Sequence, residues 1–252
     1  MNILTVESLR KGFKPHFFSK QKQVLKNLSF TIQSGRTTGF IGVNGAGKTS
    51  TLKCVLGFTR PDHGTIRFFD GHALDNEVKS KIGYLPERPY YYDFLTAKEF
   101  LKFHWDLSGA SSEGFESAAD EVLTKVNLKN TGTKKLRSFS KGMLQRIGMA
   151  QALLHKPQFL ILDEPMSGLD PDGRLLIKEI MQDEKRKGTS IFFSSHLLHD
   201  MDELCDDLVV IDKGVLIYQG SLTDFVNKDE GVEKSFKALR SRLGGLGQEF
   251  AE

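Results

Sequence analysis

The chain has 252 residues, of which 39% are hydrophobic and 27% charged, a balance typical of a globular protein with a sizeable core. Its formal net charge of +3 is too small to indicate binding of nucleic acid. The sequence has no run of about eighteen apolar residues, which excludes a membrane-spanning helix. Its first residues show no basic region followed by an apolar one, so we expect no secretory signal and a cytoplasmic protein.

The first elements predicted along the chain are two strands. β-Branched and aromatic residues favour strands over residues 3–9 and 24–32. Between them, residues 10–26 carry many Lys and Arg and no acid, which is typical of a solvated hairpin tip. The segment also holds aromatic residues, one of which could stack on a flat ring such as adenine.

A glycine-rich segment over residues 42–49 (GVNGAGKT) fits the pattern G-x-x-x-x-G-K-[ST] between an apolar run and a predicted helix over residues 48–56. The backbone N–H groups of such a loop, together with the helix N-terminus, form a cradle for a polyphosphate. Lys48 would reach the β- and γ-phosphates, and the Thr49 hydroxyl would hold Mg²⁺. The alternative, an ordinary glycine-rich turn, is disfavoured by the complete match. The predicted cradle comprises Asn44, Gly45, Ala46, Gly47, Lys48, Thr49 and Ser50.

After this loop the pattern changes from strands to helices. Strands are predicted over residues 65–69 and 81–85, and the second stops at a segment with two prolines. Thr96 opens a capping box ahead of an amphipathic helix, and residues 114–126 carry a second helical pattern. We interpret residues 88–155 as a helical lobe inserted into an α/β core.

The α/β core resumes with apolar strands over residues 159–162 and 189–193, joined by a helix predicted over residues 171–187. Alternating strands and helices favour a mostly parallel sheet with ligands at the carboxyl ends of its strands. A hairpin is predicted over residues 208–218, and a polar tail with a short amphipathic helix follows residue 226.

Three polar residues follow these two strands. Asp163 would hold the hydration shell of Mg²⁺, and Glu164 would orient or deprotonate an attacking water. A carboxylate pair at a strand end is a weak signal alone, and it becomes strong beside a phosphate loop. His196 follows the second strand; the alternative role for it is capping of the next helix.

The order and spacing of these and further segments resemble those of the ABC (ATP-binding cassette) ATPases. The similar segments are residues 84–87 (YLPE) to the Q-loop, 139–146 (FSKGMLQR) to the signature motif, 167–170 (SGLD) to the D-loop, and His196 to the switch histidine. The resemblance covers residues 1–225 and leaves 226–252 as a short tail. It implies a P-loop NTPase core with a mostly parallel sheet, flanking helices, an N-terminal antiparallel β subdomain and an inserted helical lobe.

The resemblance also implies ATP and Mg²⁺ as ligands and assigns roles within one copy. Glu164 would be the catalytic base, and His196 would sense the γ-phosphate and position the water, while Lys48 completes the catalytic set. Phe13 falls where the family keeps an aromatic residue that stacks on adenine, although Phe17 or Phe18 could take that place. The implied metal-binding residues are Thr49, Glu87 and Asp163.

Other implied roles need a second copy, because the family works as a head-to-tail dimer with two ATPs in the interface. Ser140 and Gly142 would contact the γ-phosphate of ATP bound to the opposite copy. Ser140 is also a good N-cap for a helix over residues 141–154, whose N-terminus offers positive potential. Asp170 would cross the interface and couple the two sites.

Some residues depart from the commonest family pattern. Glu87 stands where the Q-loop usually has glutamine and would place a full negative charge near Mg²⁺. Lys141 and Met143 replace a glycine and a glutamine of the signature, a form often found where an exporter's membrane subunit is encoded separately. Residues 90–94 (YYYDF) lie where the family receives that subunit; packing within the helical lobe is the alternative.

We therefore predict an ATP-hydrolysing subunit of an ABC transporter that powers transport, with export favoured, through a separate integral membrane permease. It would lie on the inner face of the cell membrane. One alternative is an ABC ATPase acting on ribosomes or DNA, but such proteins have two fused cassettes or a long coiled coil, and this chain has neither. Another is a regulatory module that binds ATP without turnover, which Glu164 and His196 disfavour.

Overall fold

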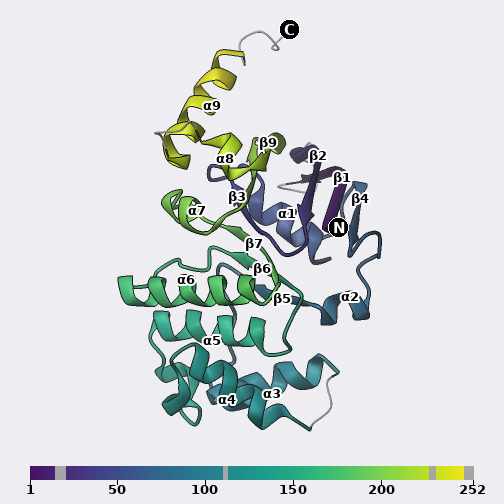
Figure 1. Cartoon of the computed structure of the whole chain (residues 1–252). Coiled ribbons are helices and arrows are strands. Elements are labelled where there is room, and N and C mark those ends of the chain that lie inside the picture. Colours follow the sequence, from purple (N-terminus) through teal and green to yellow (C-terminus); the bar gives the residue numbers. More distant parts are fainter. Residues whose placement is uncertain (15–20, 110–112, 227–230, 247–252) are drawn as a thin grey trace.

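The computed structural model describes residues 1–14, 21–109, 113–226 and 231–246, with side chains as far as residue 242. Two sheets organise the chain (Figure 1). The larger has six strands in the order β5-β6-β7-β3-β8-β9, and the smaller has three in the order β2-β1-β4. Neighbouring strands of the larger sheet are parallel except for the antiparallel pair β8 and β9, and the smaller sheet is wholly antiparallel. This is the predicted combination.

The strands agree in position with those predicted, and the first two are longer. The smaller sheet contains β1 (Asn2–Phe13), β2 (Lys22–Gln33) and β4 (His63–Phe68). The larger contains β3 (Thr37–Ile41), β5 (Ile82–Leu85), β6 (Phe159–Asp163), β7 (Ser190–Ser194), β8 (Asp207–Asp212) and β9 (Val215–Ser221). Every residue of β3, β6 and β7 is buried, as expected for the centre of a parallel sheet.

Apolar side chains of the central strands alternate between two hydrophobic cores. Phe40, Ile161 and Phe192 point into a core shared with the smaller sheet and helix α1 (Lys48–Val55). Their neighbours Leu160 and Phe193 point into the other core, which the remaining large helices cover. The sheet is therefore sandwiched between a β layer and a helical layer, and its strand ends are left for ligands.

Several helices begin at residues suited to capping them. Thr96 forms the predicted capping box with Glu99, and Ser140 accepts the N–H of Met143 at 3.2 Å. The helix over residues 76–80 was not predicted, and Asp75 caps it by accepting the N–H of Val78. The remaining helices are α2 (Asn76–Ser80), α3 (Ala97–Leu107), α4 (Phe115–Lys125), α5 (Lys141–Leu153), α6 (Pro171–Arg186), α7 (His199–Leu204), α8 (Leu222–Phe225) and α9 (Val232–Leu246).

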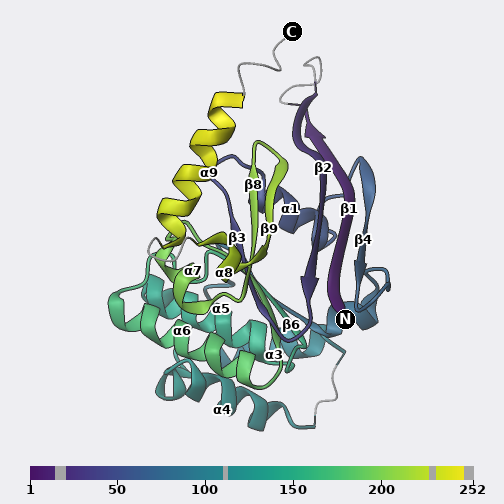
Figure 2. The ribbon, with the colours of Figure 1, turned by 45° about the horizontal axis from the view of Figure 1, so that its top comes forward.

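Helices α3, α4 and α5 pack against one another on one side of the larger sheet, and α5 also contacts β5 (Figure 2). The C-terminal helix α9 packs instead on α7. Val232 is fully buried there, and its N–H donates to Asp202 Oδ1 of α7 at 3.0 Å. Among the described residues, no helix is both long and apolar enough to span a bilayer.

The β8–β9 hairpin contacts the glycine-rich loop through Gly214. The N–H of Gly214 donates to the Ala46 carbonyl at 2.9 Å, and its own carbonyl accepts the N–H of Lys26 at 2.8 Å. Gly214 has φ +81°, and a Cβ added there would overlap the Val24 carbonyl. Only glycine satisfies both constraints, so this turn locks the loop against β2.

Substituting Gly214 by alanine should therefore destabilise the protein strongly. Gly35→Ala is the matched control, because Gly35 also has positive φ, +72°, but has no atom within 4 Å of an added Cβ. The control should cost about 1 to 2 kcal/mol of unfolding free energy, the usual cost of a left-handed residue. Gly214→Ala should cost at least twice as much in urea denaturation, and equal losses would contradict the packing argument.

Candidate active site

A cavity of about 450 Å³ opens at the carboxyl ends of β3, β5, β6 and β7. Most of the residues predicted for the phosphate loop, the metal and the chemistry line it together. Val24, Val43 and Ser167 line it as well, and none of them was predicted. The predicted residues in its wall are Asn44, Gly45, Gly47, Lys48, Thr49, Ser50, Glu87, Asp163, Glu164 and His196.

The glycine-rich loop wraps one side of the cavity. Gly45 and Gly47 adopt φ values of +80° and +110°, which turn the backbone toward the cavity. Lys48 Nζ donates to the Gly42 carbonyl at 2.6 Å, so the ammonium is held beside the loop. Burial lowers the pKa of Lys48, and the carboxylates of the opposite wall oppose that shift. Ala46 is buried behind the loop and does not line the cavity.

Asp163 lies at the end of β6 and is almost completely buried, with 2% of its surface exposed. Ser194 Oγ, at the end of the neighbouring strand, donates to Asp163 Oδ1 at 2.6 Å. Burial raises the pKa of Asp163, and the Ser194 hydrogen bond partly offsets the shift. The role of Ser194 was not predicted, although its place at a strand end beside a strand ending in Asp163 was a usable signal.

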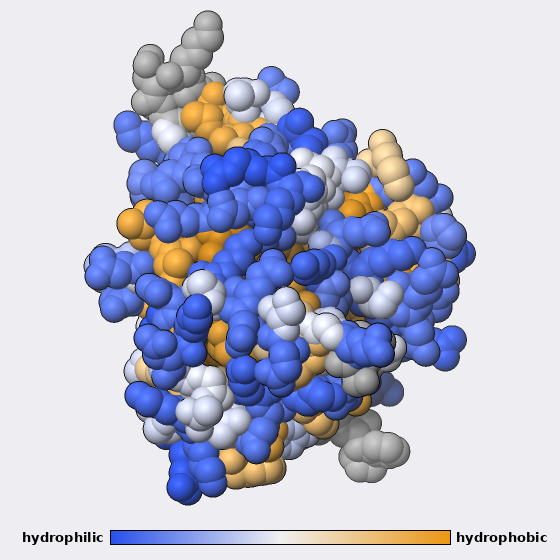
Figure 3. Space-filling model, turned by 60° about the horizontal axis from the view of Figure 1, so that its bottom comes forward, coloured by the Kyte–Doolittle hydropathy of each residue, from blue (hydrophilic) through white to orange (hydrophobic). Residues whose placement is uncertain are grey.

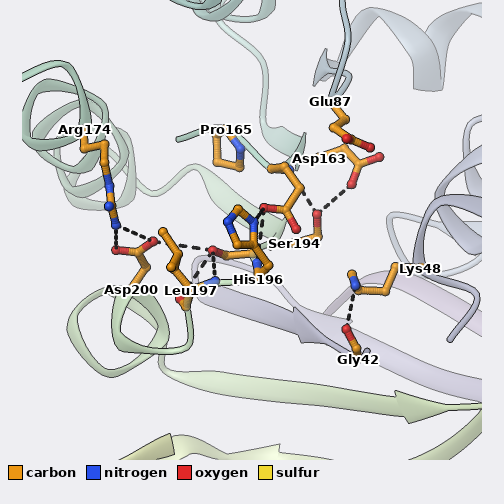
Figure 4. A network of polar contacts seen from close by, with 12 residues as sticks. Gly42, Lys48, Glu87, Asp163, Pro165, Arg174, Ser194, His196, Leu197 and Asp200 are labelled. Atoms are coloured by element: carbon orange, nitrogen blue, oxygen red, sulfur yellow. Dashed lines mark hydrogen bonds and ion pairs between the residues drawn. The ribbon is translucent and has the colours of Figure 1, made fainter. Parts of the chain in front are cut away.

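Glu164 and His196 form a close pair in the wall of the cavity, and Figure 4 shows His196 near Ser194. Glu164 Oε2 lies 2.6 Å from His196 Nδ1 and accepts the His196 backbone N–H at 3.2 Å. The backbone of Glu164 is left-handed, with φ +51°, which is a strained conformation for a residue other than glycine. Its N–H donates to Ser194 Oγ at 3.0 Å, and this bond helps to hold the strained conformation.

The three predicted metal-binding residues face the same cavity. Thr49, Glu87 and Asp163 supply a hydroxyl and carboxylate oxygens, the donor type that Mg²⁺ prefers. Within the described part of the chain, no group of three His, Cys, Asp or Glu side chains forms a metal cage. The set therefore fits a Mg²⁺ that keeps most of its ligands from water and phosphate.

Ser140, Gly142 and Asp170 do not line this cavity. They belong to a separate exposed region where the N-terminus of α5 meets the segment before α6. A Cβ added to Gly142 would lie 3.5 Å from Leu169, and the Lys141 side chain packs over Gly168. Asp170 is the N-cap of α6. We call this region, residues 140–142 and 168–170, the second pole.

The structure also reveals a connection between the second pole and the cavity. Gln145 of α5 is buried, and its Nε2 donates to the Pro165 carbonyl at 3.0 Å, directly after Glu164. Sequence reasoning did not single out Gln145. A buried glutamine must find a hydrogen-bond partner, so its occurrence on a helix with apolar neighbours was the available signal.

The candidates for adenine stacking differ in what the structure describes. Phe13, at the end of β1, is 42% exposed, lies under the Lys11 ammonium at 5.6 Å and does not line the cavity. Phe17 and Phe18 lie outside the described residues. Val24 does line the cavity, and it lies on β2, the strand paired with β1.

A larger cavity, of about 620 Å³, lies elsewhere and holds none of the predicted site residues. Its charged lining is already paired: Glu184 Oε1 accepts from Lys125 and from Lys187. The cavity of about 450 Å³ holds the phosphate loop, the carboxylates and the histidine. We take it as the site because these groups together suit binding and hydrolysis of a nucleoside triphosphate.

Known proteins resemble this chain along nearly its whole length. The family described as "ABC transporter" matches residues 25–167. The chain belongs to this family. An ABC transporter ATP-binding protein of Synechocystis sp. is 41% identical over 256 residues, spanning 98% of this chain and 72% of the relative. The linearmycin resistance ATP-binding protein of Bacillus subtilis is 34% identical over 246 residues, spanning 96% of this chain and 72% of the relative.

Solved structures of ABC transporter subunits have the same fold as this chain. The structure of an ATP-binding subunit of an ABC transporter superposes with a TM-score of 0.84 at 28% identity, covering 94% of this chain and 99% of that one. The chain is thus an ATP-binding cassette with the P-loop NTPase fold, an ATPase of the ABC transporters. The predicted family, fold class and activity are confirmed.

The buried carboxylate at the end of β6 allows a test by pH. Because burial raises the pKa of Asp163 in the folded state, ionised Asp163 opposes folding of the nucleotide-free cassette at neutral pH. Asp163→Asn keeps an acceptor for Ser194 and should raise the unfolding free energy at pH 7.5. That gain should shrink as the pH falls through the folded pKa toward the ordinary value of 3.8.

The matched control for this measurement is Asp207→Asn. Asp207 Oδ1 accepts from Arg36 Nη2 at 2.8 Å, so its loss leaves the guanidinium without that carboxylate. This variant should be less stable than the parent in urea denaturation at pH 7.5. If Asp163→Asn is also less stable there, burial is not what dominates at Asp163.

Proposed function

We propose that two copies of this cassette close head to tail over two Mg-ATP, and that hydrolysis reopens them to drive export through a separate membrane permease. The observation that carries the proposal is the division of the predicted site. The phosphate loop, carboxylates and histidine line one cavity, while Ser140, Gly142 and Asp170 occupy the exposed second pole. The ATPase domain would span residues 1–225, and residues 226–252 would be a tail.

The second pole is suited to bind an anion brought by another copy. Helix α5 begins directly after the exposed N-cap Ser140, so its first N–H groups lie at the surface. The thirteen-residue helix adds positive potential at this end. The Ser140 hydroxyl caps Met143 at 3.2 Å and remains free to donate. In a head-to-tail arrangement Ser140 and Gly142 would contact the γ-phosphate held by the other copy's Lys48.

Within one copy, each group has a chemical task. Lys48 would neutralise charge on the β- and γ-phosphates. Glu164 would accept the proton of the water that attacks the γ-phosphorus, and the imidazole of His196, already 2.6 Å from Glu164, would hold that carboxylate in place and contact the γ-phosphate. Bound Mg²⁺ would stabilise negative charge on the phosphate oxygens, held through Thr49, Asp163 and Glu87.

ATP drives closure only because it binds the closed dimer more tightly than the separated copies. Its γ-phosphate would touch both poles in the closed state and one pole in the open state. Hydrolysis removes that bridging group, so the closed state loses its advantage. The free-energy difference between these two states is what the cassette supplies to transport.

An exposed aromatic cluster is the proposed docking site for the permease. Tyr90, Tyr92 and Phe94 are 87%, 41% and 61% exposed, and the ring of Tyr92 contacts those of Tyr90, Phe94 and Phe103. Tyr91 points inward instead, and its hydroxyl donates to the Leu144 carbonyl. Tyr91 thus connects the exposed cluster, which would bind the partner, to α5. The first residues of α5 belong to the second pole.

Figure 3 shows one face of the molecule, on which the apolar areas are separate islands in a hydrophilic surface. Docking through the exposed aromatic cluster would hold the cassette at the inner face of the cell membrane. Export is favoured because a relative that is 34% identical over 96% of this chain is named for resistance to linearmycin. Resistance to a toxic compound is a task that export performs.

Glu164→Gln tests the proposed chemistry. Without a general base, kcat should fall by about 100-fold or more, while ATP affinity stays within about twofold because Lys48 and Thr49 are intact. Because the ATP stays uncleaved, the variant should then accumulate as a dimer. Light scattering of the variant with Mg-ATP would measure it. Glu179→Gln, on the exposed face of α6, is the matched control and should turn over ATP at the parental rate.

The same background tests the second pole. Adding Ser140→Arg to Glu164→Gln should abolish the ATP-dependent dimer without weakening ATP binding to the monomer, since Ser140 lies outside the cavity. If Glu164→Gln hydrolysed ATP at the parental rate, Glu164 would not be the general base. Undiminished dimer formation by the double variant would overturn the head-to-tail arrangement.

Combined alanine substitution of Tyr90, Tyr92 and Phe94 tests the docking site. These side chains are exposed, so the unfolding free energy should change by less than about 0.5 kcal/mol. The fraction of the chain that sediments with washed membranes of its own cells should fall at least fivefold. Val215→Ala, which trims a 42% exposed apolar residue of the β8–β9 hairpin, should leave that fraction unchanged. Unchanged sedimentation of the triple variant would exclude this docking site.

A further inference from the structure

Asp200 is a carboxylate buried in the first turn of α7, outside the cavity of the candidate active site. Its side chain is fully buried. Arg174 Nη2 lies 3.2 and 3.4 Å from its two oxygens, and Lys178 Nζ lies 2.9 Å from Oδ1. A buried carboxylate is costly unless it is paired, and here two cations of one neighbouring helix pair with it. A six-residue helix can pack on its neighbours without a buried carboxylate and two ion pairs, so this arrangement calls for a further explanation.

The network reaches His196 on one side. Ser195 Oγ lies 3.4 Å from Asp200 Oδ2 and accepts the N–H of Leu197 at 3.0 Å. Ser195 and Leu197 are the residues on either side of His196, so the backbone of His196 is tied at both ends. The imidazole and backbone N–H of His196 in turn hold Glu164 Oε2.

On its other side the network reaches the second pole. Arg174 and Lys178 lie one turn apart on α6, and α6 begins at its N-cap Asp170, which accepts the N–H of Gly173 at 2.9 Å. A displacement of Asp170 therefore moves the turn that carries Arg174. Figure 4 shows Arg174, Asp200, Leu197 and His196 following one another in that order.

We propose that Asp200 is a positioning residue that transmits the position of α6 to His196. Its oxygens join the two sides: Oδ1 binds Lys178 and Arg174 of α6, and Oδ2 lies between Arg174 and Ser195. When α6 is in place, the loop over residues 195–197 holds His196 against Glu164. The inference rests on the proposed roles of Glu164 and His196, and it extends them to a residue that does not line the cavity.

Asp200→Asn tests this inference, because an amide keeps the shape of the side chain and loses the charge that binds Arg174 and Lys178. We expect kcat per ATP-binding site to fall about tenfold, with KM for ATP within about twofold, since Lys48 and Thr49 lie outside the network. Glu203→Gln is the matched control: it lies on the same helix and binds the same Lys178 at 2.6 Å, and no contact joins it to Ser195. Its kcat should stay within about twofold of the parent.

A role limited to stability would give a different pattern. It would lower the number of ATP-binding sites per chain and leave kcat per site unchanged, which would overturn the proposal. If Asp200→Asn does not fold, Ser195→Ala provides the test, because it removes the hydroxyl and keeps both ion pairs. Ser195→Ala should lower kcat per site about tenfold, and where both variants fold their effects should not multiply. Parental kcat in Ser195→Ala would overturn the proposal too.

His196→Ala separates this inference from the proposed function. Parental turnover in His196→Ala would show that His196 has no role in turnover, and both ideas would then fail. If His196→Ala loses turnover while Asp200→Asn and Ser195→Ala keep the parental kcat, the proposed function stands and only the inference about Asp200 fails.

Discussion

The hydroxyl of Ser194 is the contact on which the geometry of the site depends. It donates to Asp163 Oδ1 at 2.6 Å and accepts the N–H of Glu164 at 3.0 Å, so a single side chain fixes two consecutive acids. Parallel pairing of β6 with β7 sets Ser194 opposite Asp163, and two residues later β7 delivers His196 to Glu164. The strained backbone of Glu164, with φ +51°, persists because these contacts surround it.

The same geometry concentrates negative charge. Glu87, Asp163 and Glu164 line one cavity with Lys48, which is itself partly desolvated. Burial favours the neutral form of Asp163 and of Lys48, so a free site opposes the charges that its chemistry needs. A nucleotide that brought both phosphate charge and Mg²⁺ would reverse this balance. Ligand binding would thereby offset the electrostatic cost of keeping these groups charged.

Most of this arrangement could be predicted from local sequence patterns. Glycine spacing, apolar strands and an N-cap such as Ser140 each act within a few residues, and the P-loop, strands and helix starts followed from them. Contacts that depend on three-dimensional pairing could not be predicted in this way. Ser194, Gln145 and Asp200 act on residues that are distant in sequence or in other elements, and only the strand register and helix packing reveal their partners. The five-residue helix α2 was missed because one cap and one turn give too short a pattern.

Physical links within one copy explain why the two poles would act together. Gln145 ties α5 to the Pro165 carbonyl, one residue beyond Glu164, and α6 carries Arg174 from the second pole to Asp200. Each link includes a buried side chain, Gln145 or Asp200. Hydrogen bonds of buried groups are costly to break, so they transmit displacement rather than absorb it. A γ-phosphate held by another copy would contact Ser140, and Asp170 would meet that same copy across the interface. Its effect would reach Glu164 from one side and His196 from the other, so that the cavity is complete for hydrolysis only while the partner's nucleotide is in place.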